Sequence, residues 1–265
     1  VGAGDASRDV GGGFADGSIT YGNRNDEDDF GYFFSIDLRE RKKPEVKDKV
    51  KRKFKAGALD EIETEDELKD NTFTERDFIA RFQWDLTPTT TFKLQPSVFL
   101  SEEEKLEEKE KTKSDSAGVL QETELEDKDE TADQDQFRVR GIWEKEFSEN
   151  ESLKAGLTWQ KSDQDKDKIE FKEKFDPAGN LTDTETKVEK EPLESEELRA
   201  LVEYNLLVDD EHDLTLGVEF LNKDSQGGKR ESKDGDPFEF EAGSPFEIDE
   251  DRWMFYVSDD YSLSD

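Results

Sequence analysis

Apolar and polar residues alternate along residues 77–100, and this stretch sets the pattern for the rest of the chain. The apolar positions flank a polar turn at 87–90 and are Phe78, Ala80, Phe82, Trp84, Leu86, Phe92, Leu94, Pro96, Val98 and Leu100. Because successive side chains of a strand point to opposite faces, the alternation predicts a β-hairpin with one apolar and one mostly polar face. Proline cannot donate a hydrogen bond to a β-ladder, so we expect a bulge at Pro96.

The same alternation recurs along the chain and predicts further strands. It indicates nine strands, preceded by a strand end at 1–4, and places them at about 17–21, 30–39, 77–86, 92–100, 137–147, 153–160, 198–207, 214–221 and 252–261. The polar turns at 87–90, 148–150 and 209–213 are short. We therefore expect these three turns at one end of a single antiparallel sheet.

The remaining connections are long and rich in Glu, Lys and Asp. They span about 42–72, 101–134, 161–195 and 222–249, and no period-two apolar pattern continues through them. Residues 101–111 have a helix-forming composition without an apolar face, which predicts at most a solvated helix. We expect all four segments to be solvated loops at the end of the sheet opposite the short turns.

This strict alternation of short and long connections decides the expected fold class. Long loops at every second connection are unusual in a compact soluble domain but normal in a transmembrane β-barrel, whose strands alternate lipid-facing and lumen-facing side chains. We predict an all-β, antiparallel transmembrane β-barrel segment that holds about nine or ten strands of a larger barrel and forms one domain over 1–265. The four tryptophans lie towards strand ends, where a membrane barrel places an aromatic girdle.

Composition narrows the function classes. A formal net charge of -34 argues against a basic nucleic-acid-binding surface. Charged residues make up 42% of the chain, which is typical of disorder, but 11% aromatic residues gathered in short alternating runs indicate ordered strands. With no cysteine, the chain has no disulfide, thiolate metal site or cysteine nucleophile. The one histidine, His212, falls in a polar turn, where we expect a solvated residue.

Several motifs resemble the barrel domain of TonB-dependent outer-membrane receptors. The segments 21–24, 30–32 and 39–44 resemble the first barrel strands of that family, 176–182 resembles one of its extracellular-loop turns, and 212–219 one of its strands. The most similar segment is 250–265, although Ser258 and Asp260 stand where the family pattern has Gln and Glu. The similarity extends over most of the chain in the order of strands and loops.

The resemblance implies a transporter in the bacterial outer membrane, with a full barrel of about 22 strands around a plug. Its expected partners are the lipid bilayer, a small-molecule ligand such as a ferric siderophore and, in the full-length protein, TonB. We recognise no plug domain or TonB box in these residues. We expect no enzymatic activity and no cofactor. A passive porin, or a secreted acidic β-sandwich for adhesion or glycan binding, remain the alternatives.

Four arginines are the candidate site residues. Arg81, Arg138, Arg140 and Arg199 fall on the polar rows, which would line a barrel lumen. There they could attract an anionic ligand such as a ferric chelate, or pair with lumen carboxylates such as Asp85, Glu144 and Glu203. We predict no catalytic residue.

We also predict no defined metal site. An EF-hand-like run of aspartates at 163, 165 and 167 has Lys168 and Lys174 where the motif needs Gly and Glu. Loose calcium binding by the acidic loops stays open. Because nine strands and a stub cannot close a barrel of the family's size, we expect an open, curved sheet whose edges near 17–21 and 253–261 are unpaired.

Overall fold

The chain folds as a single antiparallel β-sheet. The computed structural model describes residues 2–9, 12–25, 29–55, 58–208, 212–241 and 244–261, and these form one sheet of 13 strands. No helix long and apolar enough to cross a bilayer occurs among the described residues. The predicted all-β antiparallel fold class is confirmed, and each of the nine predicted strands lies within an observed one.

The strands differ greatly in length. They are β1 (Gly2–Asp9), β2 (Gly13–Arg24), β3 (Phe30–Lys42), β4 (Glu45–Lys55), β5 (Ala58–Thr87), β6 (Thr90–Asp115), β7 (Leu120–Ser148), β8 (Glu151–Phe175), β9 (Leu181–Leu207), β10 (His212–Gly227), β11 (Arg230–Lys233), β12 (Glu239–Phe240) and β13 (Phe246–Tyr261). The main strand order is β1-β4-β5-β6-β7-β8-β9-β10-β13. The 30-residue β5 is long enough to pair with β4 along its first half and with β3 along its second half.

The long connections are strands, so the prediction of solvated loops was wrong. Residues 42–72 are mostly β4 and the first half of β5, and residues 101–134 are mostly the outer parts of β6 and β7. The predicted helical composition at 101–111 lies in β6, which pairs with β5 and β7 along its length. Cross-strand pairing satisfies the hydrogen-bonding groups of the backbone and brings opposite charges together. These interactions outweigh the helix propensity of the glutamates and lysines. We call the parts of β4 to β11 that lie within 42–72, 101–134, 161–195 and 222–249 the strand extensions.

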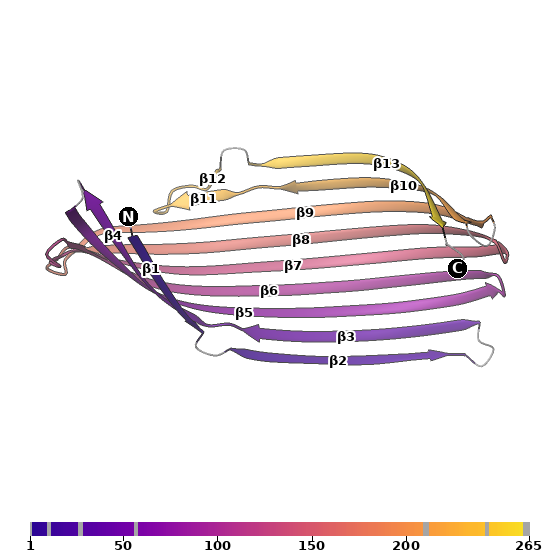
Figure 1. The fold of residues 1–265 in the computed structure, drawn as a ribbon, viewed down its shortest axis with the longest axis horizontal. Helices are drawn as coiled ribbons and strands as arrows, with labels where there is room; N and C mark the ends of the chain where they lie inside the picture. The colour runs from indigo at the N-terminus through magenta and orange to yellow at the C-terminus, as the bar shows by residue number, and fades with distance from the viewer. Residues whose placement is uncertain are drawn as a thin grey trace.

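The turns follow the predicted arrangement in space. The tight turns that join β5 to β6 and β7 to β8 lie at the right end of the sheet in Figure 1, and those after β6 and β8 lie at the left end. The strand extensions all run towards that left end. The third predicted turn falls largely on 209–211, outside the described residues. The described turns thus place the short connections at one end and the long segments towards the other.

One face of the sheet carries a continuous apolar band near the short turns. The register places Phe82 opposite Leu94, Leu94 opposite Gly141 and Val202 opposite Val218, so the predicted apolar rows share one face from β2 to β13. We call the opposite side the polar face. No second sheet covers the band within the described residues, because all described strands belong to one sheet. The secreted β-sandwich requires such a second sheet and is not supported by this fold.

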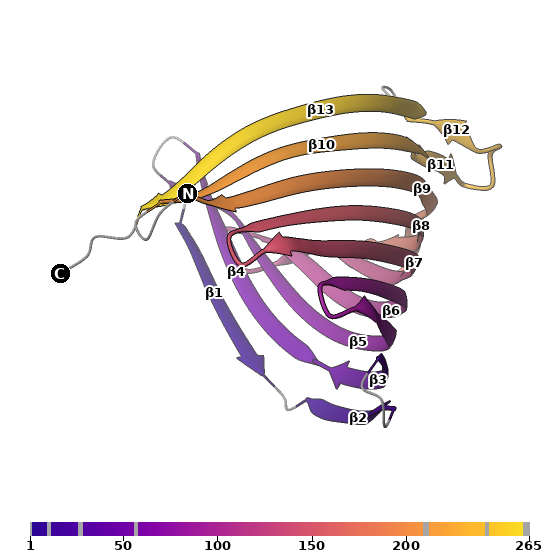
Figure 2. The same ribbon diagram turned by 90° about the vertical axis from the view of Figure 1, so that its right-hand side faces the viewer.

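The sheet is curved, and within the described residues its edge strands β1, β2 and β13 are each paired on one side only. Figure 2 shows the strands as a curved layer, with β13 at the top and β2 at the bottom. In the described part of the chain, β2 pairs only with β3, and β13 pairs only with β10. The predicted open edges near 17–21 and 253–261 are therefore confirmed.

The prediction of a bulge at Pro96 was wrong. The β5–β6 register is the same on both sides of this residue, from Ile79 opposite Ser97 to Phe82 opposite Leu94. The ladder instead leaves Ala80 and Arg81 without a paired residue on β6. Proline has no N–H to donate, so the strands lose local pairing here while keeping their alignment.

Candidate functional site

The polar face contains a hollow lined by five strands. It has a volume of about 320 Å³, and residues of β2, β3, β5, β6 and β7 line it, among them Arg24, Phe33, Arg81, Gln83, Lys93, Gln95 and Arg140. The register explains this grouping, because Gln83 lies opposite Lys93 and Gln95 lies opposite Arg140. The hollow lies beside the interruption of the β5–β6 ladder at Pro96.

The nearby carboxylates already have partners. Glu144 accepts a hydrogen bond from the Lys93 ammonium at 2.5 Å. Asp85 pairs with Arg24 and also accepts hydrogen bonds from Gln83 at 3.0 Å and Thr91 at 2.9 Å. These acidic groups are therefore not free to neutralise further arginines.

Arg81 and Arg140 add positive charge to this hollow. The Arg81 guanidinium carbon lies 5.6 Å from the centre of the Phe33 ring, a favourable cation–π distance. Within the described residues neither arginine forms an ion pair with a carboxylate, in contrast to Lys93. The wall of the hollow consequently carries more positive than negative charge.

The other two candidate arginines lie outside this group. Arg138 donates a hydrogen bond from Nε to Gln160 at 2.9 Å, and Arg199 pairs with Glu197 at 3.2 Å and Glu219 at 3.4 Å. Ion pairing thus accounts for Arg199, although with other carboxylates than expected. Glu203, one of the expected partners, instead accepts hydrogen bonds from Lys154 at 2.5 Å and the Tyr256 hydroxyl at 2.7 Å.

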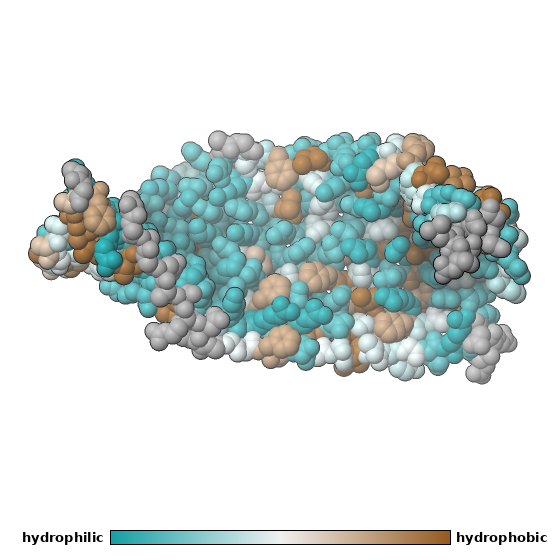
Figure 3. Space-filling view, in the orientation of Figure 1, coloured by the Kyte–Doolittle hydropathy of each residue, from teal (hydrophilic) through white to brown (hydrophobic). Residues whose placement is uncertain are grey.

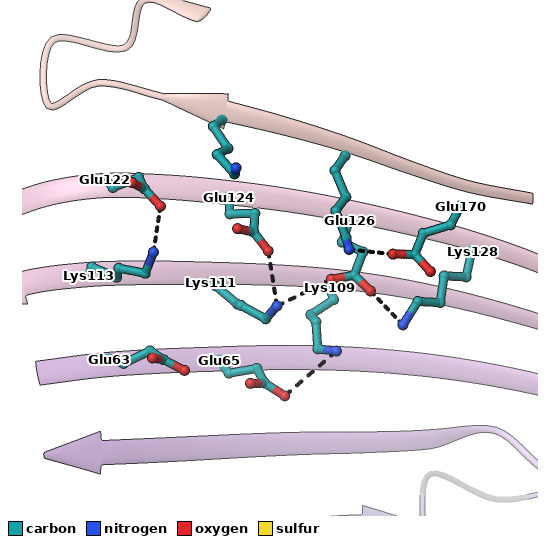
Figure 4. Close-up of polar contacts among 12 residues, drawn as sticks. Glu63, Glu65, Lys109, Lys111, Lys113, Glu122, Glu124, Glu126, Lys128 and Glu170 are labelled. Atoms are coloured by element: carbon teal, nitrogen blue, oxygen red, sulfur yellow. Dashed lines mark hydrogen bonds and ion pairs between the residues drawn. The ribbon is translucent and has the colours of Figure 1, made fainter. Parts of the chain in front are cut away.

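Beyond the hollow, the strand extensions carry a lattice of Lys and Glu on the same polar face (Figure 4). We call this set the ion lattice. Its directly opposed pairs include Lys51–Glu63 at 3.0 Å, Lys113–Glu122 at 2.7 Å, Lys111–Glu124 at 3.0 Å, Lys105–Glu130 at 3.0 Å and Lys69–Glu107 at 2.9 Å. Most positions alternate in sign from one strand to the next, with lysines on β4, β6 and β8 and glutamates on β5, β7 and β9.

One row of the ion lattice has every sign inverted. Lys69, Glu107, Lys128, Glu170 and Lys187 lie opposite one another from β5 to β9, so lysines stand on the strands that otherwise carry glutamate. Opposite charges still face each other within this row. A shift of two residues in any of these strands would bring like charges together, so the row favours one register.

The lattice changes the acidity of its buried carboxyl groups. Burial raises the pKa of Glu107, but the ammonium groups of Lys69 and Lys128 outweigh it and lower that pKa to about 2. The pKa of Glu170 also falls to about 2, because Lys172 and Lys168 outweigh the effect of its burial. Glu126 is only 3% exposed and has a lowered pKa for the same kind of reason. These glutamates are ionised over the whole physiological range.

The sequence held a signal for the ion lattice that apolar patterning missed. In 42–72, lysines recur at 47, 49, 51 and 53 and glutamates at 61, 63, 65 and 67, which is the period of a strand expressed in charge. The period-two pattern in 42–72 is therefore one of charge and not of hydropathy. Figure 3 shows the consequence, since hydrophilic residues cover most of the strand extensions on the face in view.

The opposite face of the extensions gathers acidic residues. Asp133 lies opposite both Asp165 and Glu102, and burial together with these neighbours raises its pKa. The aspartates of the rejected EF-hand motif lie along β8, as expected for a strand and not a calcium loop. The described residues contain no group of three or more acidic, His or Cys side chains arranged to hold a metal ion.

His212 lies in a strand and not in the predicted turn, although its side chain is 41% exposed, as expected of a solvated residue. It begins β10, and its Nδ1 lies 2.9 Å from a carboxylate oxygen of Asp259 on β13. Its ring centre is 4.8 Å from that of Tyr261. The residue therefore joins the last two strands of the sheet.

Neither a scan of known protein families nor a search of curated proteins finds a match to this chain.

Proposed function

We propose that this chain forms part of the wall of an outer-membrane β-barrel of the TonB-dependent receptor type. Such a receptor takes up a scarce nutrient across the bacterial outer membrane, and we propose a ferric siderophore as that nutrient. The apolar band would contact lipid, the polar face would line the lumen, and the strand extensions would project from the outer surface. In the full-length receptor, TonB would supply the energy that displaces the plug.

The uncovered apolar band is the observation that carries this proposal. Large apolar side chains on it are open to the surroundings, with exposed fractions of 53% for Leu157, 47% for Val202 and 74% for Phe255. A water-soluble protein rarely leaves so extended an apolar surface uncovered. A sheet with one apolar face of this kind is suited to contact the hydrocarbon of a bilayer. Strands of about 9 to 11 residues are long enough to cross it.

Aromatic residues border the band in the manner of a membrane interface. Towards the short turns, the Trp84 ring centre lies 5.4 Å from that of Phe30 and 5.6 Å from that of Phe92. Trp159 and Trp253 lie on the same face towards the strand extensions. Indole rings favour the boundary between hydrocarbon and headgroups, so two such borders match a bilayer better than a folded core.

Spin labels on adjacent faces test the proposal. Because the chain has no native cysteine, Val202→Cys and Leu157→Cys report on the band, and Thr158→Cys is a matched control on the polar face. With nitroxides in detergent micelles, we expect high collision rates with oxygen at 157 and 202, and with a water-soluble nickel chelate at 158. Equal exposure of all three to the chelate, or shielding of 157 and 202 from both reagents, would overturn the proposal.

A further inference from the structure

We propose that the hollow on the polar face is a binding site for a small organic dianion that carries an aromatic ring. The inference deepens the proposed function by naming a ligand class, and its biological role rests on that function. The site itself consists of Arg81 and Arg140 as anion ligands, the Phe33 and Ile142 side chains as an apolar wall, and Gln95 between the arginines.

The first argument is the local reversal of charge. The chain has a net charge of -34, yet Arg81 and Arg140 line one hollow in which the adjacent carboxylates are engaged by other cations. Neither arginine lies within ion-pair distance of a carboxylate in the described residues, although the charge of Arg140 contributes to lowering the pKa of Glu203. In a protein so acidic, this is an unusual local surplus of positive charge. The overall negative charge repels large polyanions, whereas a small anion can enter this limited region of positive potential.

The second argument is the geometry of the donors. Arg140 lies directly opposite Gln95, and Arg81 extends from the neighbouring strand on the same face. The cation–π contact with Phe33 at 5.6 Å holds the Arg81 guanidinium over an aromatic surface. Guanidinium groups match carboxylates in a planar, bidentate manner. Two of them on nearby strands therefore suit two carboxylates on one ligand.

The third argument is size and lining. A volume of about 320 Å³ lies at the lower end of the range for small-molecule sites. Such sites combine apolar walls with a few polar groups that orient the ligand, and here Phe33 and Ile142 provide the apolar part. An aromatic ring of the ligand can pack against Ile142, which follows Arg140 on β7, while Phe33 supports the Arg81 guanidinium and the arginines hold the carboxylates.

Titration of the whole chain with phthalate, an aromatic dicarboxylate, tests the site. In zwitterionic detergent micelles, calorimetry or NMR should detect saturable binding of phthalate. The double variant Arg81→Gln/Arg140→Gln should bind at least about tenfold more weakly, because each lost charged hydrogen bond is worth more than a factor of ten. Arg138→Gln is the matched control, since this arginine lies on the same face but contacts Gln160.

Each outcome decides the proposal. Saturable binding by the wild type and Arg138→Gln, lost in the double variant, supports it. Absence of saturable binding, or equal weakening in Arg138→Gln, overturns it, as does sulfate competing as well as phthalate, since only charge would then matter. Nitroxide accessibility at 157 and 158, measured on the same preparations, reports the membrane orientation separately. Failure of the ligand site is thereby distinguished from failure of the proposed function.

Discussion

At the scale of single residues, neighbours on one strand lie in opposite environments. Val202 belongs to the apolar band, and the next residue, Glu203, pairs with Lys154 on the polar face. The same chemical change should therefore have very different effects at positions one residue apart.

A lysine in the band is the first prediction at this scale. Val202→Lys should lower the free energy of unfolding in detergent micelles, because it places a charge in hydrocarbon, which costs about 2–4 kcal/mol near the middle of a bilayer. Ser258→Lys, on the polar face and opposite the uncharged Thr215, should be nearly neutral. Urea unfolding in detergent micelles measures both variants, and similar losses at the two positions would contradict the assignment of the faces.

Asp133 allows a second residue-scale prediction. Its raised pKa means that the carboxylate form is less favourable in the folded chain, so the group contributes stability at acidic pH and loses it as pH rises through the folded pKa. Asp133→Asn should therefore raise the free energy of unfolding at pH 7, by about 0.2–1 kcal/mol. Chemical denaturation at pH 7 and about pH 3 tests this, since the gain should shrink at the lower pH.

At the scale of elements, the strand extensions form strands through cross-strand ion pairs, whereas the strands of the apolar band form through their apolar face. In the folded chain the pKa of Glu107 and that of Glu170 are about 2, below the ordinary glutamate value of 4.5. A lowered folded pKa adds stability above the unfolded value and loses it as pH falls through the folded one. Amide hydrogen exchange should thus show the strand extensions opening between about pH 4.5 and 2, while the apolar band stays protected. Simultaneous opening of both regions would contradict separate stabilisation.

The sign-inverted row permits a sharper test of the same elements. Lys128→Glu would leave three carboxylates in line, with the new one between Glu107 and Glu170. It would replace the Lys128–Glu107 ion pair at 3.3 Å by repulsion and place a second negative charge opposite Glu170. We expect a loss of about 1–3 kcal/mol at pH 7, and a smaller loss for the neutral control Lys128→Gln. Equal losses in both variants, measured by denaturation, would show that packing of the lysine stem matters more than its charge.

The strands of the apolar band could be predicted from sequence, but their extensions could not be predicted from hydropathy alone. Period-two apolar rows indicate a strand wherever one face meets hydrocarbon or a core, and all nine were identified in this way. In 101–111 the glutamates and lysines favour a helix locally, and only pairing with β5 and β7 makes a strand. The grouping of Arg81 with Arg140 needs the register of three strands, which the sequence does not specify.

At the scale of the whole molecule, the two open edges determine what this chain can do alone. The outer sides of β2 and β13 carry backbone N–H and C=O groups that no described strand pairs. A micelle lets water reach these groups, but in a bilayer each unsatisfied group costs several kcal/mol. The apolar band favours insertion, whereas the edges oppose it.

The last prediction follows from this balance. Expressed alone in the envelope of a bacterium that lacks its own siderophore receptor, the chain should be extracted from membranes by urea and should restore no ferric siderophore uptake. The free-energy cost of several unpaired backbone groups at each edge exceeds the gain from burying the apolar side chains of β2 and β13 in the bilayer. Membrane fractionation and radiolabelled iron uptake measure the two effects, with an intact receptor of the host as positive control. Urea-resistant insertion would indicate that the two edges find partners, either each other or those of a second copy.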